Sequence, residues 1–134
     1  MSAIRVLVID DERDFATAIV AQLTRRGFQA SAAFSGPEAL ESIQAAEYDA
    51  VVLDLKMPGM DGLETLQKIR RIAPGLEVIV LTGHGTVAAG IGGMRLGAAD
   101  FLQKPVHIHT LCTAIEAAVE RSGARRSEAA DPMK

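Results

Sequence analysis

The stretch that decides the fold is residues 49–62, DAVVLDLKMPGMDG. Its first half is a short apolar run, Ala50 to Leu53, which stops at Asp54. Branched apolar residues in a short run, followed by Pro-Gly and Asp-Gly pairs, predict a buried strand that ends in a loop. An ionised carboxylate next to such a strand is costly unless another group pairs with it. Asp54 is therefore either a residue that caps the turn or part of a site.

Length, charge and cysteine content limit the class of protein. A chain of 134 residues is expected to form one domain with its own core. The formal net charge of −3 at pH 7 argues against direct nucleic-acid binding. Cys112 is the single cysteine, which excludes an intrachain disulfide and a cysteine metal cluster. The apolar run at residues 6–9 is too short for a signal peptide or a membrane span, so we expect a cytoplasmic protein without membrane contact.

Short apolar strands and amphipathic helices alternate five times along the chain. The strands are predicted at residues 4–9, 28–34, 50–54, 76–81 and 101–103. The helical patterns are predicted near residues 15–23, 37–43, 63–72, 86–96 and 108–119. Helical connections of this length predict an α/β fold with a doubly wound parallel sheet. From Ser122 the sequence is polar and without periodicity, which predicts a disordered tail or the start of a linker.

Polar residues that can do chemistry directly follow four of the predicted strands. Asp10 and Asp11 follow the first strand, Asp54 the third, Thr82 the fourth and Lys104 the fifth. Each has a structural alternative, as a helix cap, a turn residue or a surface lysine. Because sites in such sheets lie at the carboxyl ends of the strands, where the strand order reverses, we expect these side chains to meet.

Three carboxylates at one place repel one another, so either one is protonated or a cation binds. Oxygen ligands without cysteine or histidine favour Mg²⁺. A carboxylate beside Mg²⁺ and a lysine ammonium is placed to attack phosphorus, which would convert Asp54 to an aspartyl phosphate. Thr82 could then donate a hydrogen bond to a phosphoryl oxygen.

The same residues carry a resemblance to a known family. Together with the loop DLKMPGMDG (54–62) and the stretch LGAADFLQKP (96–105), they resemble the receiver domain of bacterial two-component response regulators. The resemblance implies a flavodoxin-like, five-stranded parallel sheet of order 2-1-3-4-5 with five helices. It also implies a receiver domain at residues 1–121, a polar tail or linker start at 122–134, and a cis peptide between Lys104 and Pro105.

The resemblance further implies how the site takes up a phosphoryl group. Asp54 would receive it from the phosphohistidine of a sensor histidine kinase or a phosphotransfer protein. Asp10, Asp11, Asp54 and the backbone carbonyl of Lys56 would hold Mg²⁺. The protein would not be a conventional enzyme, because its chemistry would be limited to Mg²⁺-dependent self-phosphorylation from a phosphodonor and self-dephosphorylation.

The remaining roles concern signalling. By resemblance, Lys104 pairs with the phosphoryl group, and Thr82 and Phe101 form a switch pair that remodels the face of the fourth helix, last strand and fifth helix. Lys56 and His84, each two residues beyond a site residue, are expected to tune dephosphorylation. The signal would pass to a downstream protein or to an output domain outside this sequence, and a homodimer is a further alternative.

Other functions remain open at this point. A non-phosphorylated pseudo-receiver, which only binds proteins, would share the fold. A flavodoxin would need a phosphate loop rich in Ser, Thr and Gly where this chain has DDERD at residues 10–14. A hydrolase of the haloacid dehalogenase type would need a DxD motif after the first strand. Glycines at 90, 92 and 93 indicate either close packing or a mobile fourth helix.

Overall fold

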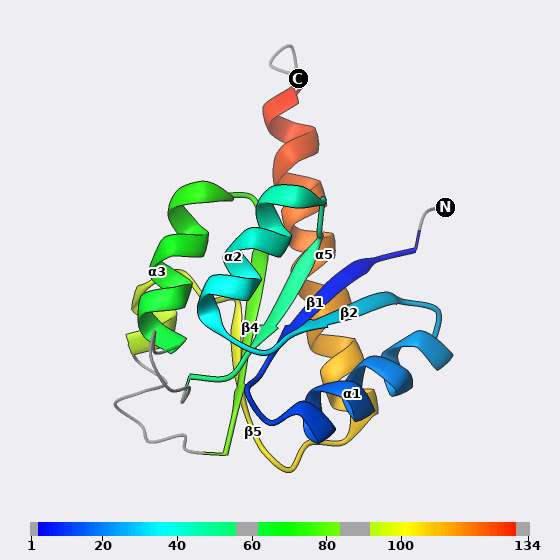
Figure 1. Cartoon of the computed structure of the whole chain (residues 1–134). Helices are drawn as coiled ribbons and strands as arrows, with labels where there is room; N and C mark the ends of the chain where they lie inside the picture. Colours follow the sequence, from blue (N-terminus) through cyan, green and yellow to red (C-terminus); the bar gives the residue numbers. More distant parts are fainter. Residues whose placement is uncertain (1–2, 56–61, 84–91, 131–134) are drawn as a thin grey trace.

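The five strands form one parallel sheet. A computed structural model describes residues 3–55, 62–83 and 92–130, the last seven of these by their backbone only (Figure 1). The strands are β1 (Arg5–Ile9), β2 (Gln29–Ala33), β3 (Ala50–Leu53), β4 (Glu77–Thr82) and β5 (Asp100–Gln103), in the order β2-β1-β3-β4-β5. The helices are α1 (Arg13–Arg25), α2 (Gly36–Ala45), α3 (Gly62–Ile72) and α5 (Ile108–Ala130), and residues 92–95 are helical between β4 and β5. The predicted doubly wound fold and its strand order are confirmed.

Helices cover both faces of the sheet (Figure 1). Val6 and Val8 of β1 belong to a buried cluster with α1 and α5, whereas Leu7 and Ile9 belong to a cluster with α2 and α3. This alternation follows from the two-residue period of a strand. The strands β3 and β4 are buried throughout, which explains why their sequences read as continuous apolar runs.

Local sequence signals set the ends of the first two helices. The glycine that closes α1, Gly27, has a φ of 93°, a left-handed conformation that glycine adopts at little cost. At the start of α2, the Ser35 side chain accepts a hydrogen bond of 3.2 Å from the backbone N–H of Glu38. Proline at the first turn completes this predicted helix start.

The strand order reverses between β1 and β3, and this places two aspartates side by side. In the parallel register, Ile9 of β1 lies opposite Leu53 of β3. The next residues along the two strands are Asp10 and Asp54. At its carboxyl edge, the sheet therefore brings close together two carboxylates that lie far apart in the sequence.

The fifth helix is longer than predicted. It runs to Ala130, so the prediction of disorder from Ser122 is wrong for residues 122–130. Ser122 is 4% exposed, and its hydroxyl donates a hydrogen bond of 3.3 Å to the backbone oxygen of Gly75. The following residues are mainly Ala, Arg and Glu, which favour helix without giving an apolar stripe. The role of residues 122–134 as a tail or linker stays a prediction.

Two of the three glycines of the fourth helical segment lie among the described residues. A Cβ at Gly92 would lie 3.5 Å from Leu63 Cδ1, and a Cβ at Gly93 would lie 3.5 Å from Val80 Cγ2. Both are ordinary van der Waals separations, so the helix packs closely on α3 and β4 without requiring glycine for space. The mobility of this helix stays a prediction, and Gly90 lies outside the described residues.

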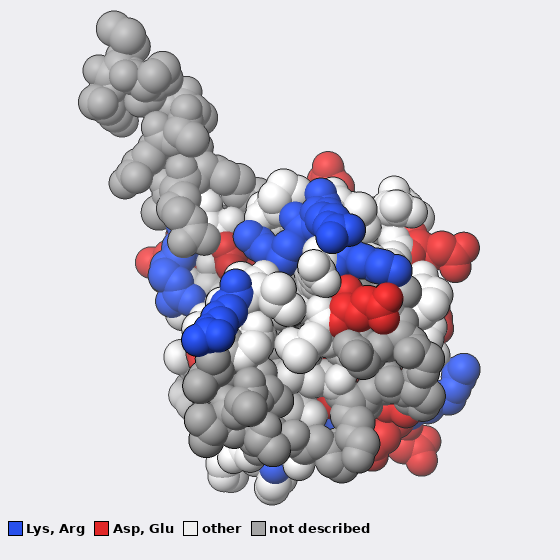
Figure 2. Space-filling model, turned by 90° about the vertical axis from the view of Figure 1, so that its left-hand side faces the viewer, with Lys and Arg blue, Asp and Glu red and all other residues white. Residues whose placement is uncertain are grey.

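The side of the molecule that carries α3 has charges of both signs. Figure 2 shows this side, with Lys and Arg gathered in its upper part and Asp and Glu beside them. Arg70 and Arg71 lie in the last turn of α3, where their positive charge interacts favourably with the negative end of the helix dipole. The Arg70 guanidinium also donates a hydrogen bond of 2.9 Å to the backbone oxygen of Leu76.

Among the described helices, none has an apolar stretch of membrane-spanning length.

Candidate functional site

Two buried aspartates form the base of the site. Asp10 and Asp54 are 2% and 3% exposed. The backbone N–H of Asp10 donates to the oxygen of Ala33 at 3.1 Å, and that of Asp54 donates to the oxygen of Ile9 at 3.0 Å. These hydrogen bonds extend the ladders of β1 and β3 by one residue. They fix the backbone position from which each aspartate side chain projects.

Lys104 brings an ammonium into contact with these carboxylates. Its Nζ lies 2.7 Å from Asp10 Oδ2, 3.4 Å from Glu12 Oε1 and 3.7 Å from Asp54 Oδ2. The lysine follows β5, and its backbone N–H donates to the oxygen of Thr82 at 3.1 Å. The peptide between Lys104 and Pro105 is cis, as expected.

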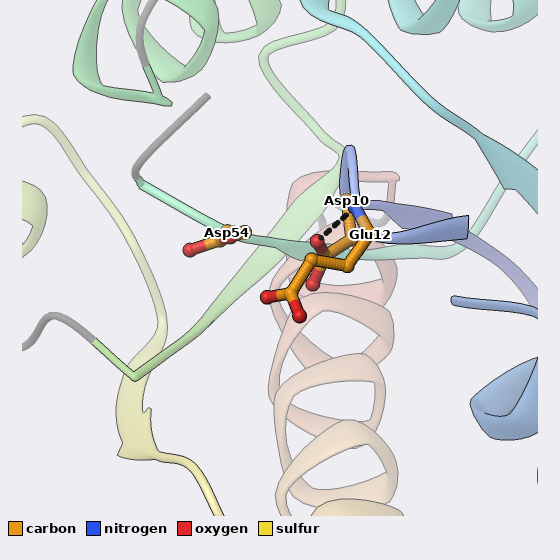
Figure 3. Close-up of side chains that lie close together, drawn as sticks. All are labelled: Asp10, Glu12 and Asp54. Atoms are coloured by element: carbon orange, nitrogen blue, oxygen red, sulfur yellow. Dashed lines mark hydrogen bonds between the residues drawn. The ribbon is translucent and has the colours of Figure 1, made fainter. Parts of the chain in front are cut away.

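Glu12 completes the carboxylate cluster in the part of the chain that the structure describes. One carboxylate oxygen from each of Asp10, Glu12 and Asp54 lies within 4.8 Å of the others. Figure 3 shows the three side chains, with the 2.9 Å hydrogen bond from the Glu12 backbone N–H to Asp10 Oδ1. Asp11, expected as a metal ligand, is exposed and is not a member of this cluster, so its role stays a prediction.

The electrostatics reflect three carboxylates that share one ammonium. Burial raises the pKa of Asp10 above its usual 3.8, and the nearby charge of Asp54 adds to this, although hydrogen bonds from Lys104 and Glu12 oppose it. Burial would lower the pKa of Lys104, but the hydrogen bond to Asp10 and the carboxylate charges raise it above its usual 10.5. For Asp10 the main cause is burial, whereas for Lys104 it is the surrounding carboxylates, which favour the charged ammonium.

An aromatic ring lies against the same ammonium. Lys104 Nζ lies 4.0 Å from the centre of the Phe15 ring, a cation–π contact. Phe15 belongs to α1 and packs against the cluster of α1 and α5. The sequence pattern predicted a helix that begins near this residue, but it did not predict the contact with Lys104.

Thr82 and Phe101 lie on the neighbouring strands β4 and β5. Thr82 is fully buried at the end of β4. Phe101 lies opposite Val80 in the register of the two strands and packs, partly exposed, against the cluster of α2 and α3. Thr82 thus lies at the carboxyl edge of the sheet, where the site is, and Phe101 lies two register positions further from that edge. The action of this pair as a switch stays a prediction.

The structure thus brings together Asp10, Asp54 and Lys104, as the sequence predicted. It adds Glu12 and Phe15, which sequence reasoning missed because only the fold brings α1 next to the end of β5. Glu12 carries one weak signal, since it directly follows the Asp pair. Lys56 and His84 lie outside the described residues.

The donor set fits Mg²⁺. All the clustered ligand atoms are carboxylate oxygens, the ligands that this ion prefers. The surplus negative charge around Lys104 further favours a divalent cation.

The fold and the site define a small α/β protein whose acidic centre lies at the switch point of a doubly wound sheet. The chain belongs to the response regulator receiver domain family, because the family model, described as "Response regulator receiver domain", matches residues 6–116. It is thus a receiver domain of two-component systems, and the resemblance found in the sequence is confirmed.

Curated relatives are longer than this chain. It is 36% identical over 131 residues to the response regulator MprA of Mycobacterium ulcerans, a match that covers 98% of this chain and 56% of MprA. It is 35% identical over 124 residues to the transcriptional regulatory protein TctD of Salmonella typhimurium, covering 92% of this chain and 55% of TctD. The chain therefore spans about half the length of these relatives.

Solved structures share the fold. A CheY-like receiver domain protein from Methanospirillum hungatei superposes with a TM-score of 0.88 at 25% identity, covering 92% of this chain and 99% of that one. A receiver domain protein from Clostridium thermocellum gives 0.84 at 36% identity, covering 90% and 98%. NtrX from Brucella abortus gives 0.90 at 33% identity, but the match covers 96% of this chain and 30% of NtrX.

Proposed function

We propose that Asp54 accepts a phosphoryl group from the phosphohistidine of a sensor histidine kinase or a phosphotransfer protein. One observation carries this proposal: Asp54 is buried at the sheet's switch point, 3.7 Å from the Lys104 ammonium and beside Asp10. A buried carboxylate next to a cation and other carboxylates is arranged for reaction with an anionic phosphoryl donor.

In the proposed reaction, a carboxylate oxygen of Asp54 attacks phosphorus. The bond from phosphorus to the donor nitrogen breaks, and the leaving imidazole keeps that electron pair and takes up a proton. Lys104 offsets the negative charge of the phosphoryl oxygens, at the cost of its contact with Asp10. Mg²⁺, held by Asp10, Asp11, Asp54 and the carbonyl of Lys56, would neutralise further charge on the transferring group.

Phosphorylation would then change the face next to β5. The aspartyl phosphate carries a charge approaching −2 at neutral pH. Thr82 donates a hydrogen bond from its hydroxyl to a phosphoryl oxygen, and Phe101 rotates inward. These movements shift the population of conformations of the face formed by residues 92–95, β5 and α5. The output is a downstream protein or an output domain, in keeping with the greater length of MprA and TctD. Lys56 and His84 tune the lifetime of the aspartyl phosphate. The protein acts in the cytoplasm.

Intact mass spectrometry after incubation with acetyl phosphate tests the proposal. The wild type should gain the mass of one phosphoryl group with Mg²⁺ and none without it. Asp54→Asn should gain none. Asp49→Asn, which changes the aspartate at the other end of β3, should be labelled like the wild type.

The outcomes separate two functions. Labelling that needs both Mg²⁺ and Asp54 supports the phosphoacceptor. An unlabelled wild type, under conditions that label another receiver domain, would contradict it and would favour the pseudo-receiver that only binds proteins. Among labelled proteins, equal phosphate lifetimes of wild type, Lys56→Ala and His84→Ala would remove the tuning role.

A further inference from the structure

The ring of Phe15 covers one side of the lysine at the centre of the site. Lys104 Nζ lies 4.0 Å from the ring centre, well inside the distance of about 6 Å at which an ammonium is attracted to a ring face. The backbone of Phe15 is in the first turn of α1, and its side chain packs against the buried cluster between α1, α5 and the sheet. The core therefore fixes the position of the ring.

The ring and the carboxylates hold the ammonium in different ways. Asp10 and Glu12 accept hydrogen bonds from Lys104 at 2.7 and 3.4 Å. Each such bond uses an N–H group that a phosphoryl oxygen would need. A ring face attracts the whole positive charge, so it restrains the ammonium without adding a competing acceptor or more negative charge.

We infer that Phe15 is a positioning residue for phosphoryl transfer, whose ring keeps the Lys104 ammonium beside Asp54 with N–H groups available for the phosphoryl oxygens. The inference rests on the proposed function, in which Lys104 pairs with the phosphoryl group. A leucine at position 15 would still fill the core. It would let the ammonium move away from Asp54 towards Glu12, whose side chain is 64% exposed, and towards solvent.

Rates of labelling by acetyl phosphate with Mg²⁺ test this role. Phe15→Leu should be phosphorylated about three- to tenfold more slowly than the wild type. Phe15→Tyr keeps an aromatic face and should stay within about twofold of the wild type. Phe28→Leu is the matched control, because Phe28 belongs to the same buried cluster but lies beyond the C-terminal end of α1, and its rate should not change.

A second background separates positioning from general packing. In Lys104→Met, the ammonium is absent, so Phe15→Leu should cause no further loss of rate. An equal fractional loss in both backgrounds would show that the ring acts through the core and would overturn the inference. A Phe15→Tyr protein as slow as Phe15→Leu would overturn it as well.

A spectroscopic test needs neither metal nor phosphodonor. The Lys104 methylene protons next to Nζ lie near the ring face, so their NMR signals should be shifted upfield by the ring current in lysine-labelled wild type. The shift should persist in Phe15→Tyr and disappear in Phe15→Leu. Identical signals in wild type and Phe15→Leu would refute the contact.

These results distinguish the two proposals. If the wild type is not labelled at Asp54, the proposed function fails, and the positioning role fails with it. If the wild type is labelled and Phe15→Leu is labelled equally fast, only the positioning role fails.

Discussion

The strands β1 and β3 carry charged residues at both ends, but the two ends differ in how deeply these charges are buried. At the amino ends, Arg5 and Asp49 are 3.5 Å apart, with side chains 40% and 22% exposed. At the carboxyl ends, Lys104 and Asp10 are 2.7 Å apart, with side chains 13% and 3% exposed. Water and salt screen the first pair, whereas the second holds surplus negative charge away from water. The carboxyl ends thus hold charge that folding alone does not explain, as expected of a functional site.

The largest expected effect concerns the backbone beside Asp54. A Cβ at Gly62 would overlap the Cα of Leu55 and lie 2.6 Å from the backbone oxygen of Asp54. The Gly62 N–H also donates to the oxygen of Leu55 at 2.8 Å, so the two segments cannot separate freely. We expect Gly62→Ala to lower the free energy of unfolding by about 3 kcal/mol, measured by urea denaturation.

A glycine near the amino ends of the strands provides the control. Gly75 precedes β4, and a Cβ there would meet nothing within 4 Å. Gly75→Ala should therefore leave the urea midpoint nearly unchanged. Equal destabilisation by the two substitutions would show that the carboxyl end is no more tightly built than the amino end.

The next largest expected effect is the loss of stability on removing the positive charge of Lys104, compared with that of Arg5. Lys104→Met leaves three carboxylates without their ammonium, so we expect a loss of about 2 kcal/mol in the free energy of unfolding at neutral pH. Arg5→Met, at the other end of the sheet, should cause a much smaller loss that disappears in about 1 M NaCl. Urea midpoints at low and high salt measure both.

The sign of the pH dependence follows from the raised pKa of Lys104. The stability that this lysine contributes is fully present below the unfolded-state value near 10.5 and is lost as the pH rises through the higher folded-state value. Wild type and Lys104→Met should therefore converge in stability at strongly alkaline pH. A constant difference across that range would contradict the assignment of the lysine as the cation of the cluster.

The smallest expected effect comes from neutralising one aspartate at either end of the strands, and the change in the free energy of unfolding should have opposite signs at the two ends. Because burial raises the pKa of Asp10, its ionised form destabilises the fold, and Asp10→Asn should increase the free energy of unfolding by about 1 kcal/mol at neutral pH. The gain should begin to shrink as the pH falls through the folded-state pKa of Asp10, which lies above 3.8, and should be gone below the unfolded-state value near 3.8. Asp49→Asn should instead be slightly destabilising, because Asp49 accepts hydrogen bonds from Arg5. Thermal or urea unfolding of both variants checks the signs, and destabilisation by Asp10→Asn would contradict the surplus of negative charge.

Much of the fold could be predicted from local patterns. Apolar runs such as residues 50–53 and helical spacings such as that of residues 63–72 identified the strands and helices because burial on one or two faces imposes a period. The same reasoning ended the last helix too early, since residues 122–130 favour helix by propensity without an apolar stripe.

The site could be predicted only in part. Asp10, Asp54 and Lys104 were identifiable because each directly follows a strand, and strand ends meet at one edge of a parallel sheet. The contact of Phe15 was not identifiable, and the membership of Glu12 had only the weak signal of its place after the Asp pair. Each depends on the direction of a side chain at the start of α1 relative to a lysine from the opposite end of the chain.

By itself, the sequence determined the alternation of strands and helices, the burial of the central strands and the polar residues at their ends. These properties depend on neighbours a few positions apart, so they are written in local periodicity. The tertiary structure alone decided that three carboxylates and an aromatic ring surround one ammonium, and that Asp11 is exposed. The reason is physical: distances between strand ends depend on the order of strands in the sheet and on the packing of α1 beside it, which no local pattern specifies.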